Sequence, residues 1–258
     1  MAKAFHTLQK SDVIQHNTRA DTLKGRIPEG NMESLATNNR FVALNSRWLS
    51  SELQQAALSR LLRYLHAPFA ALQKTRISDR ALISIDNYTI YCGDADEGKV
   101  GGCSMFVRND YNNLVEEFGS KSSRCAFVRL QGHKGLKLWI LSAHAPTEIA
   151  EDHNKDAFYD ELNTLMSKIP SQQVVIVGID ANAKMGLEQQ SDVLGKWFYA
   201  IEQTSDNLNR LIGLCEQTNL ITESTFKRNH RRHQLTWRGT TPLTPKEQRK
   251  RKMPTLKL

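Results

Sequence analysis

One stretch decides the fold: Val174-Val175-Ile176-Val177-Gly178-Ile179-Asp180-Ala181-Asn182. Its first six residues are apolar, and most of them are β-branched. A continuous run of this kind and length is typical of a strand that is buried on both faces, as central strands of α/β proteins are. The run ends at Asp180, so a carboxylate and a carboxamide follow directly at the carboxyl end of a buried strand.

Short β-rich segments surround this strand on both sides in the sequence. Strands are predicted at Phe41–Leu44, Phe69–Leu72, Tyr88–Cys92, Cys103–Val107, Cys125–Leu130, Leu136–Ala143, Leu220–Thr222 and Gln234–Trp237. Helices are predicted over 156–169 and 206–217, and a third begins at the capping box formed by Ser51 and Gln54. Its apolar positions are Leu53, Ala57, Leu61 and Leu65. Hairpin-like strands mixed with crossover helices predict a layered α/β sandwich.

Length and composition indicate a folded protein with a sizeable core. The chain has 258 residues, of which 40% are hydrophobic and 24% are charged, which is near the average of soluble globular proteins. No apolar run approaches the roughly 20 residues of a membrane span, and the N-terminus lacks the apolar block of a secretory signal. We expect an intracellular protein, nuclear or cytoplasmic, with no membrane partner. The four cysteines show no C-x-x-C spacing, so buried free thiols are expected.

The positive charge is concentrated at the C-terminal end. Residues 227–258 hold eleven Lys or Arg against one acid, Glu247, so this segment carries +10 of a chain whose net charge is +8. The cluster Arg249, Lys250, Arg251 and Lys252 can bind phosphates or act as a nuclear address, and a solvated charged segment is the alternative. The expected division is a flexible leader over 1–38, a folded domain over 39–238 and a basic tail over 239–258.

Polar residues at three strand ends are the candidates for a site. Asp180 and Asn182 would project from the same side of an extended backbone, where the carboxylate can orient a water and the amide can stabilise a phosphorane. His144 ends another strand and can bind phosphate or carry a proton, and Asn45 ends the first strand. For each residue the alternative is an ordinary turn or rim position. Thr236 and Trp237 would line a substrate groove, or else pack in the core.

The order of these motifs resembles a known superfamily. The chain has an Asn ending its first strand, then L-Q-x-T-R at residues 72–76, A-P-T at 145–147, G-I-D-A-N-A-K at 178–184 and L-T-W at 235–237. This series resembles the endonuclease/exonuclease/phosphatase superfamily. More narrowly, it is similar to the apurinic/apyrimidinic-type endonuclease domain of non-LTR retrotransposons of the RTE clade.

The resemblance implies a four-layer α/β sandwich that cleaves DNA phosphodiesters with Mg²⁺, with RNA as a second candidate substrate and no small-molecule cofactor. By position, Asn45 matches a metal-site asparagine, Asp180 the residue that positions the attacking water, and Asn182 the residue that stabilises the transition state. His144 occupies a place where relatives commonly have Tyr. Thr236, Trp237 and the cluster at 249–252 would contact the nucleic acid.

Two departures from the family pattern argue against activity. Lys74 stands where the family has a metal-binding Glu within L-Q-E-T-R. Exchanging −1 for +1 about 4 Å from a divalent cation changes the Coulomb energy by about 16 kcal/mol at an effective dielectric of about 20, before relaxation. The family's closing D-Y and S-D-H motifs also do not occur before Leu258. We therefore expect a sandwich that lacks its C-terminal strands.

The resulting prediction is a nuclease-type domain with little or no phosphodiesterase activity. The alternative is a non-catalytic module that binds nucleic acid or a nuclear partner through its basic tail. An active Mg²⁺-dependent endonuclease is the third possibility, favoured by the motif order and opposed by Lys74. The oligomeric state is not determined by the sequence.

Overall fold

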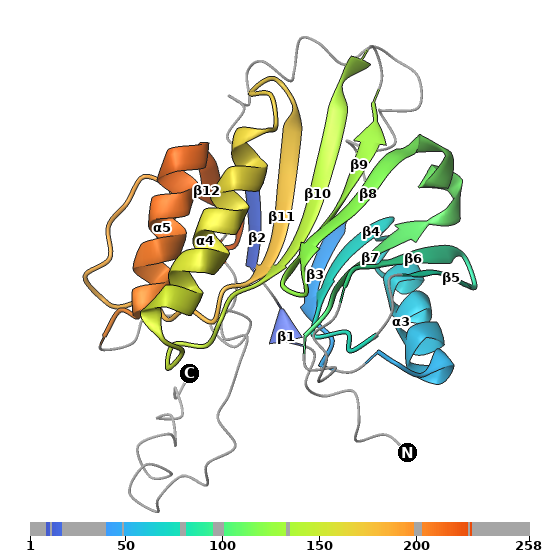
Figure 1. Ribbon diagram of the computed structural model, residues 1–258, viewed down its shortest axis with the longest axis horizontal. Coiled ribbons are helices and arrows are strands. Elements are labelled where there is room, and N and C mark those ends of the chain that lie inside the picture. The colour runs from blue at the N-terminus through green and yellow to red at the C-terminus, as the bar shows by residue number, and fades with distance from the viewer. Residues whose placement is uncertain are drawn as a thin grey trace, which may run out of the picture.

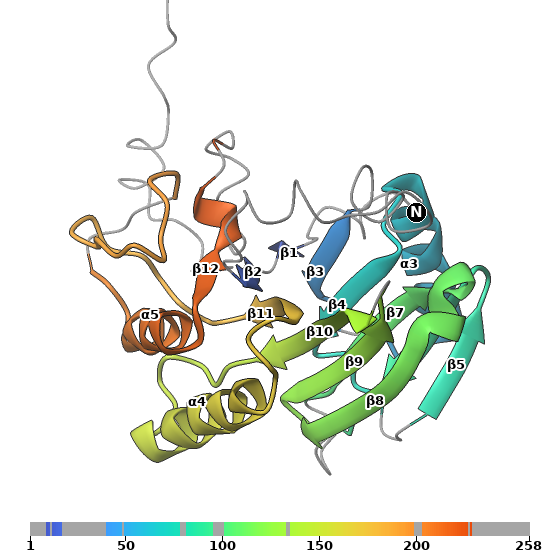
Figure 2. The same ribbon diagram turned by 90° about the horizontal axis from the view of Figure 1, so that it is seen from above.

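Two six-stranded β-sheets pack face to face and carry helices on their outer faces (Figures 1 and 2). The computed structural model describes residues 9–10, 12–16, 40–47, 49–77, 81–94, 101–132, 135–198, 203–226 and 228. Helix α3 (Glu52–Tyr64) packs on one sheet, and α4 (Asp152–Ser167) and α5 (Asp206–Thr218) pack on the other. The predicted four-layer α/β sandwich is confirmed.

The first sheet has the order β1-β3-β4-β7-β6-β5. Its strands are β1 (Gln9–Lys10), β3 (Phe41–Asn45), β4 (Phe69–Gln73), β7 (Cys103–Arg108), β6 (Tyr88–Cys92) and β5 (Ala81–Ile85). The second sheet has the order β12-β2-β11-β10-β9-β8. Its strands are β12 (Leu220–Thr222), β2 (Asp12–His16), β11 (Val174–Asp180), β10 (Lys137–His144), β9 (Cys125–Gln131) and β8 (Val115–Ser122). Short 3₁₀ helices span Asn109–Leu114 and Glu223–Thr225.

Each sheet contains one parallel strand pair that is connected through a helix. β3 leads through α3 to β4, with Asn45 opposite Gln73, and β10 leads through α4 to β11, with His144 opposite Asp180. A parallel pair requires such a crossover, and both of its strands end at the same edge of the sheet. The two crossover units therefore bring four carboxyl ends to one end of the sandwich.

Alternation along β11 divides its side chains between two cores. Val175, Val177 and Ile179 pack against the helices α4 and α5, whereas Gly178 faces Ala43 and Ala71 of the opposite sheet. Because strand side chains alternate with period two, Asp180 lies on the same side as Gly178. The strand thus directs its terminal carboxylate toward the seam between the two sheets.

Helix α3 confirms the predicted capping box and only part of the predicted apolar face. Ser51 accepts a hydrogen bond from the Gln54 backbone N–H, and the Gln54 side chain accepts one from the Ser51 N–H. The residues buried on this helix are Gln55, Leu58, Ser59 and Leu62. Leu53, by contrast, is 81% exposed. Leu61 and Leu65 of the predicted face pack, partly buried, against the core, and Leu58 and Leu62 form a more deeply buried i, i+4 pair beside them.

We expect Ser51→Ala to lower the free energy of unfolding by about 1 kcal/mol, because the helix loses the acceptor for one of its unpaired N-terminal N–H groups. Urea denaturation followed by circular dichroism measures this loss. Ser171→Ala, which removes a hydroxyl at an exposed turn position, is the control. Equal unfolding midpoints for the two variants would contradict the capping role.

The predicted strands agree with the structure except where burial is partial. β5 and β8 were missed because each is an edge strand with only partly buried, partly polar positions. Strands β1 and β2 lie within 1–38, so the expectation that the fold begins near Asn39 is wrong for these residues. Both strands are too short to show a clear alternation of apolar and polar residues. The strand predicted at Gln234–Trp237 lies outside the described residues.

None of the helices in the described part of the chain is both long and apolar enough to cross a membrane.

Candidate functional site

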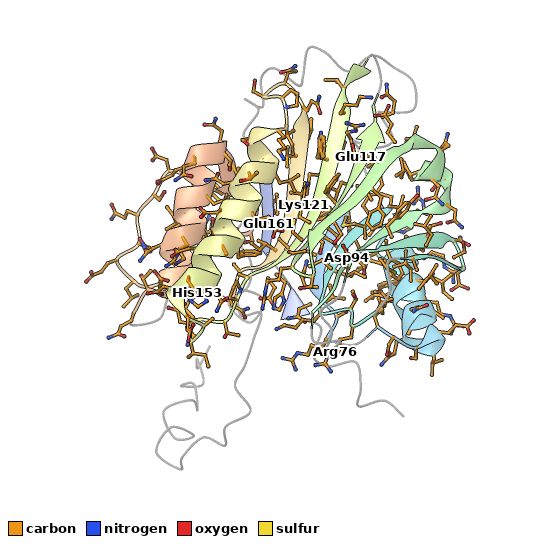
Figure 3. All side chains as sticks on the ribbon, in the orientation of Figure 1. Arg76, Asp94, Glu117, Lys121, His153 and Glu161 are labelled. Atoms are coloured by element: carbon orange, nitrogen blue, oxygen red, sulfur yellow. The ribbon has the colours of Figure 1, made fainter. Side chains whose placement is uncertain are left out.

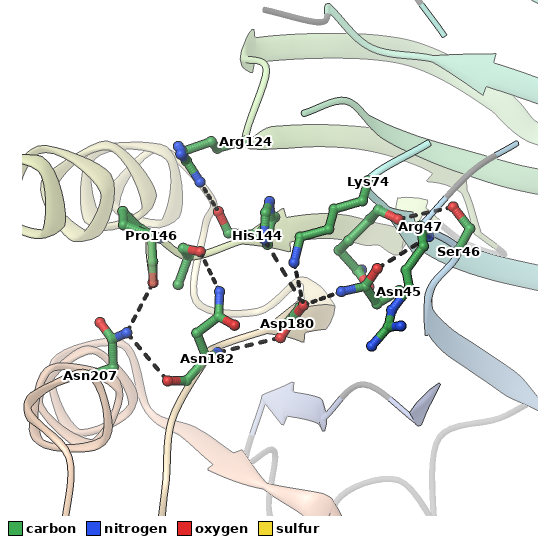
Figure 4. A network of polar contacts seen from close by, with 12 residues as sticks. Asn45, Ser46, Arg47, Lys74, Arg124, His144, Pro146, Asp180, Asn182 and Asn207 are labelled. Carbon is green, nitrogen blue, oxygen red and sulfur yellow. Dashed lines mark hydrogen bonds and ion pairs between the residues drawn. The ribbon is translucent and has the colours of Figure 1, made fainter. Parts of the chain in front are cut away.

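Four strand ends bring Asn45, Lys74, His144 and Asp180 into one polar cluster (Figure 4). Asn45 ends β3, Lys74 follows β4 directly, His144 ends β10 and Asp180 ends β11. These residues are separated by up to 135 positions in the chain, and the two crossover units place them together. The strand-end candidates from the sequence, with Lys74, therefore form one site.

Asp180 is the centre of this cluster. Its Oδ2 atom accepts a hydrogen bond from Asn45 Nδ2 at 2.5 Å, lies 3.7 Å from Lys74 Nζ and lies 4.0 Å from His144 Nε2. Its Oδ1 atom accepts a longer bond of 3.4 Å from the Asn182 backbone N–H. One carboxylate thus faces three nitrogen atoms of neighbouring side chains.

The backbone after β4 turns sharply and presents Lys74 to the site. Lys74 has φ +55° and Arg76 has φ +57°, both in the left-handed region that non-glycine residues rarely adopt. Hydrogen bonds from the N–H groups of Thr75 and Arg76 to the carbonyls of Gly102 and Gly101 fix this turn. The Lys74 side chain is 27% exposed and that of Asp180 is 21% exposed. At about 4 Å and an effective dielectric of about 20, their attraction is about 4 kcal/mol before desolvation.

Asn182 does not project beside Asp180 as an extended backbone would require. The strand ends at Asp180, and Asn182 has φ +48°. Its Nδ2 group donates instead to the carbonyl of Ala145 at 2.8 Å. Asn207, which is fully buried, supports this turn by donating to the carbonyls of Pro146 and Asn182. The expected convergence of both side chains through strand geometry is therefore wrong, because the turn redirects the amide.

The residues at this site do not fit a Mg²⁺ ion. Mg²⁺ requires oxygen ligands, usually including one or two carboxylates. Asn45 directs its N–H toward Asp180, and its Oδ1 oxygen accepts the Arg47 backbone N–H at 3.2 Å. The Lys74 ammonium lies beside the single carboxylate of the cluster, where it would repel a cation. Within the described ranges, no group of three or more His, Cys, Asp or Glu residues could hold a metal.

A buried polar bridge between the sheets supports the cluster from behind. Gln73 is fully buried, and its Nε2 group donates to Ser142 Oγ at 3.1 Å and to the Gly178 carbonyl at 3.0 Å. Ser142 Oγ donates in return to the Leu72 carbonyl at 2.8 Å. This bridge joins β4 to β10 and β11 one or two residues before Lys74, His144 and Asp180. The sequence pattern does not predict this bridge, although a Gln that ends an apolar strand is a usable signal of a buried polar contact.

Arginines surround the cluster on the same end of the molecule. Arg47 follows β3 and lies beside Asn45, and Arg124 donates to the His144 carbonyl at 3.3 Å (Figure 4). Arg76 also lies at this end of the molecule, at the bottom of the view in Figure 3. Among the residues labelled in Figure 4, the cationic ones are Arg47, Lys74 and Arg124.

The four cysteines are free and buried, as predicted. Burial raises the pKa of the Cys92 thiol to about 11 and that of Cys103 to about 12. Because the thiolate is the nucleophilic form, such thiols are inert at neutral pH. They are structural residues.

The remaining candidates, Thr236, Trp237, Arg249, Lys250, Arg251 and Lys252, lie outside the described residues.

Comparison with known proteins gives similar sequences and similar structures. No family model matches the chain. Over 156 residues the chain is 28% identical to craniofacial development protein 2 of Bos taurus, a match that covers 60% of this chain and 26% of that protein. The chain thus spans about a quarter of that relative's length.

Two solved structures with the same general architecture are endonucleases by name. One is the AP endonuclease LMAP of Leishmania major, with 12% identity, a TM-score of 0.48 and 78% of each chain covered. The other is the endonuclease domain of TRAS1, a telomere-specific non-LTR retrotransposon, with 14% identity, a TM-score of 0.45, and 66% of this chain and 69% of that chain covered. Both structures are of the kind that the motif-based resemblance led us to expect.

Proposed function

We propose that this chain is an endonuclease/exonuclease/phosphatase-type domain, of retrotransposon endonuclease kind, that binds DNA and does not hydrolyse it through Mg²⁺. The observation that carries the proposal is the ion pair between Lys74 Nζ and Asp180 Oδ2 at 3.7 Å. An ammonium group stands at the position of the family's metal-binding carboxylate, and it neutralises the one acidic residue of the cluster.

The chemistry of phosphodiester hydrolysis explains why this exchange matters. A hydrolase of this kind must activate water and offset the charge that develops on the phosphate. Here the Asp180 carboxylate already accepts a hydrogen bond from Asn45 and faces Lys74, so it is poorly placed to accept a proton from water. His144 Nε2 lies 4.0 Å from the same oxygen and is 7% exposed, which limits its access to a substrate. The site retains groups that can bind phosphate and lacks a free general base.

We therefore propose a module that binds nucleic acid without cleaving it. The positive residues Lys74, Arg47 and Arg124 around the cluster support it, because phosphate contacts by Lys and Arg supply most sequence-independent affinity for DNA. The basic segment 239–258 would add to this affinity, and a nuclear or cytoplasmic location follows as part of the proposal. RNA is the second candidate partner.

A nicking assay tests the absence of Mg²⁺-dependent hydrolysis. The full chain is incubated with supercoiled plasmid, and separately with a duplex that contains one abasic site, in Mg²⁺ and in EDTA. We expect no cleavage above that of the Asp180→Ala variant, since the missing acid–base function alone costs about 10²–10⁴ in rate. Cleavage that requires Mg²⁺ and disappears in Asp180→Ala would overturn the proposal.

A further inference from the structure

We propose that the Asp180 carboxylate is an internal occupant of an anion site, and that a phosphate group binds Lys74 once this carboxylate is displaced. The inference rests on the proposed function and adds to it a ligand and a competing contact. In a metal-dependent site a bound cation would attract the phosphate. In this chain the positive charge is the Lys74 ammonium group, so Asp180 and a phosphate would compete for contact with it.

The charges at the site support an anion as the ligand. Among the residues of the contact network in Figure 4, Asp180 is the single carboxylate, and Arg47, Lys74 and Arg124 are cationic. Neutral donors complete the set: Asn45 Nδ2 points at the carboxylate oxygen, and the Asn182 backbone N–H points at the other oxygen. Ammonium, amide and backbone N–H groups are the donors with which proteins bind phosphate oxygens.

The geometry of the ion pair indicates that the carboxylate can be displaced. Lys74 Nζ and Asp180 Oδ2 are 3.7 Å apart, longer than the 2.7–2.9 Å that is typical of a charge-assisted hydrogen bond. Both side chains are partly exposed, at 27% and 21%, so an anion in solution can reach the ammonium. The turn that carries Lys74 is held by backbone hydrogen bonds and does not depend on the ion pair. Lys74 can therefore change its partner while the backbone stays in place.

Binding of a short DNA strand in EDTA tests the competition. The probe is a fluorescein-labelled 12-nucleotide single strand at fixed ionic strength, and a second arm uses inorganic phosphate as competitor. We expect Asp180→Asn to bind the strand about tenfold more tightly than the unchanged chain, because the amide keeps the shape and removes the competing charge. We expect Lys74→Gln to bind about tenfold more weakly. Lys168→Gln, at the far end of α4, should leave the affinity unchanged.

The double variant Lys74→Gln/Asp180→Asn separates the proposed coupling from a general change in charge. If Asp180 competes for Lys74, removing the carboxylate gives no gain once Lys74 is absent, so the double variant binds like Lys74→Gln alone. An equal gain in both backgrounds would overturn the inference, because it would reflect net charge. Weaker binding by folded Asp180→Asn, checked by circular dichroism, would overturn it as well.

The phosphate arm identifies the source of the ligand. If millimolar inorganic phosphate displaces the strand, the site recognises the phosphate group itself. If Asp180→Asn binds the strand more tightly but phosphate does not displace it, the site recognises the DNA backbone. No strengthening by Asp180→Asn in either arm overturns the inference. The nicking assay is independent of these results, so an active nuclease and an absent anion site would be told apart.

Discussion

Gly178→Ala is expected to lower the free energy of unfolding by about 2–3 kcal/mol, although it adds only one methyl group. A Cβ atom at this position would lie 2.6 Å from the Ala71 Cβ and 2.9 Å from the Ala43 Cβ. Neither neighbour is a flexible side chain that can swing away, since both are alanines on strands of the opposite sheet. The two sheets would have to separate at this contact.

Gly213→Ala is the matched control, because it makes the same chemical change in an open position. Gly213 lies within α5, and a Cβ there would meet nothing within 4 Å. Since alanine favours a helix over glycine by about 1 kcal/mol, this variant should be slightly more stable than the unchanged chain. Urea denaturation measures the two changes in the free energy of unfolding, which should have opposite signs. A shift of equal sign and size would contradict the packing argument.

This close approach also bears on the site. Gly178 precedes Asp180 by two residues on the same face of β11, and its carbonyl accepts the hydrogen bond from Gln73. Small residues at positions 43, 71 and 178 let the sheets approach, and the Gln73 bridge joins them there. Asn45 and Asp180 are then near enough for a hydrogen bond of 2.5 Å. Packing between the sheets and the geometry of the polar cluster are therefore linked.

The sequence predicted those parts of the fold that one strong local pattern determines. The apolar run at 174–179 predicted β11 to within one residue, and with it the position of Asp180 at a strand end. The capping box predicted the start of α3. Edge strands such as β8 carry partly exposed polar residues, and they are stabilised by pairing with a neighbouring strand. The local sequence pattern does not contain this pairing.

The sequence predicted which residues form the site, but it did not predict how their side chains are arranged. Motif order singled out Asn45, Lys74, His144 and Asp180, which the fold brings together. At Asn182 the stated alternative, a turn, holds in place of strand geometry, because the residue adopts φ +48°, where a strand pattern cannot continue. The Gln73 bridge was missed because its partners lie 69 and 105 residues away. Long-range partners of buried polar groups are set by the packing of two sheets.

Lys74→Glu is expected to make the stability of the fold depend on Mg²⁺. In EDTA the variant should be less stable than the unchanged chain, because a carboxylate replaces the ammonium that lies 3.7 Å from Asp180. Two carboxylates with the Asn45 side chain beside them form an oxygen-rich site of the kind that Mg²⁺ binds. If the dissociation constant is about 0.1 mM, 10 mM Mg²⁺ adds about 2.7 kcal/mol to the free energy of unfolding.

Thermal unfolding in EDTA and in 10 mM Mg²⁺ measures this dependence, and the expected gain corresponds to about 5–10 °C in the Tm of Lys74→Glu. The unchanged chain should shift by less than about 1 °C, because its ammonium excludes the ion. Lys168→Glu, which makes the same change of charge at the opposite end of β11 from Asp180, controls for general ionic effects. A shift of the unchanged chain as large as that of Lys74→Glu would mean that Lys74 does not exclude Mg²⁺. The ion pair with Asp180 would then no longer support the proposed absence of Mg²⁺-dependent hydrolysis.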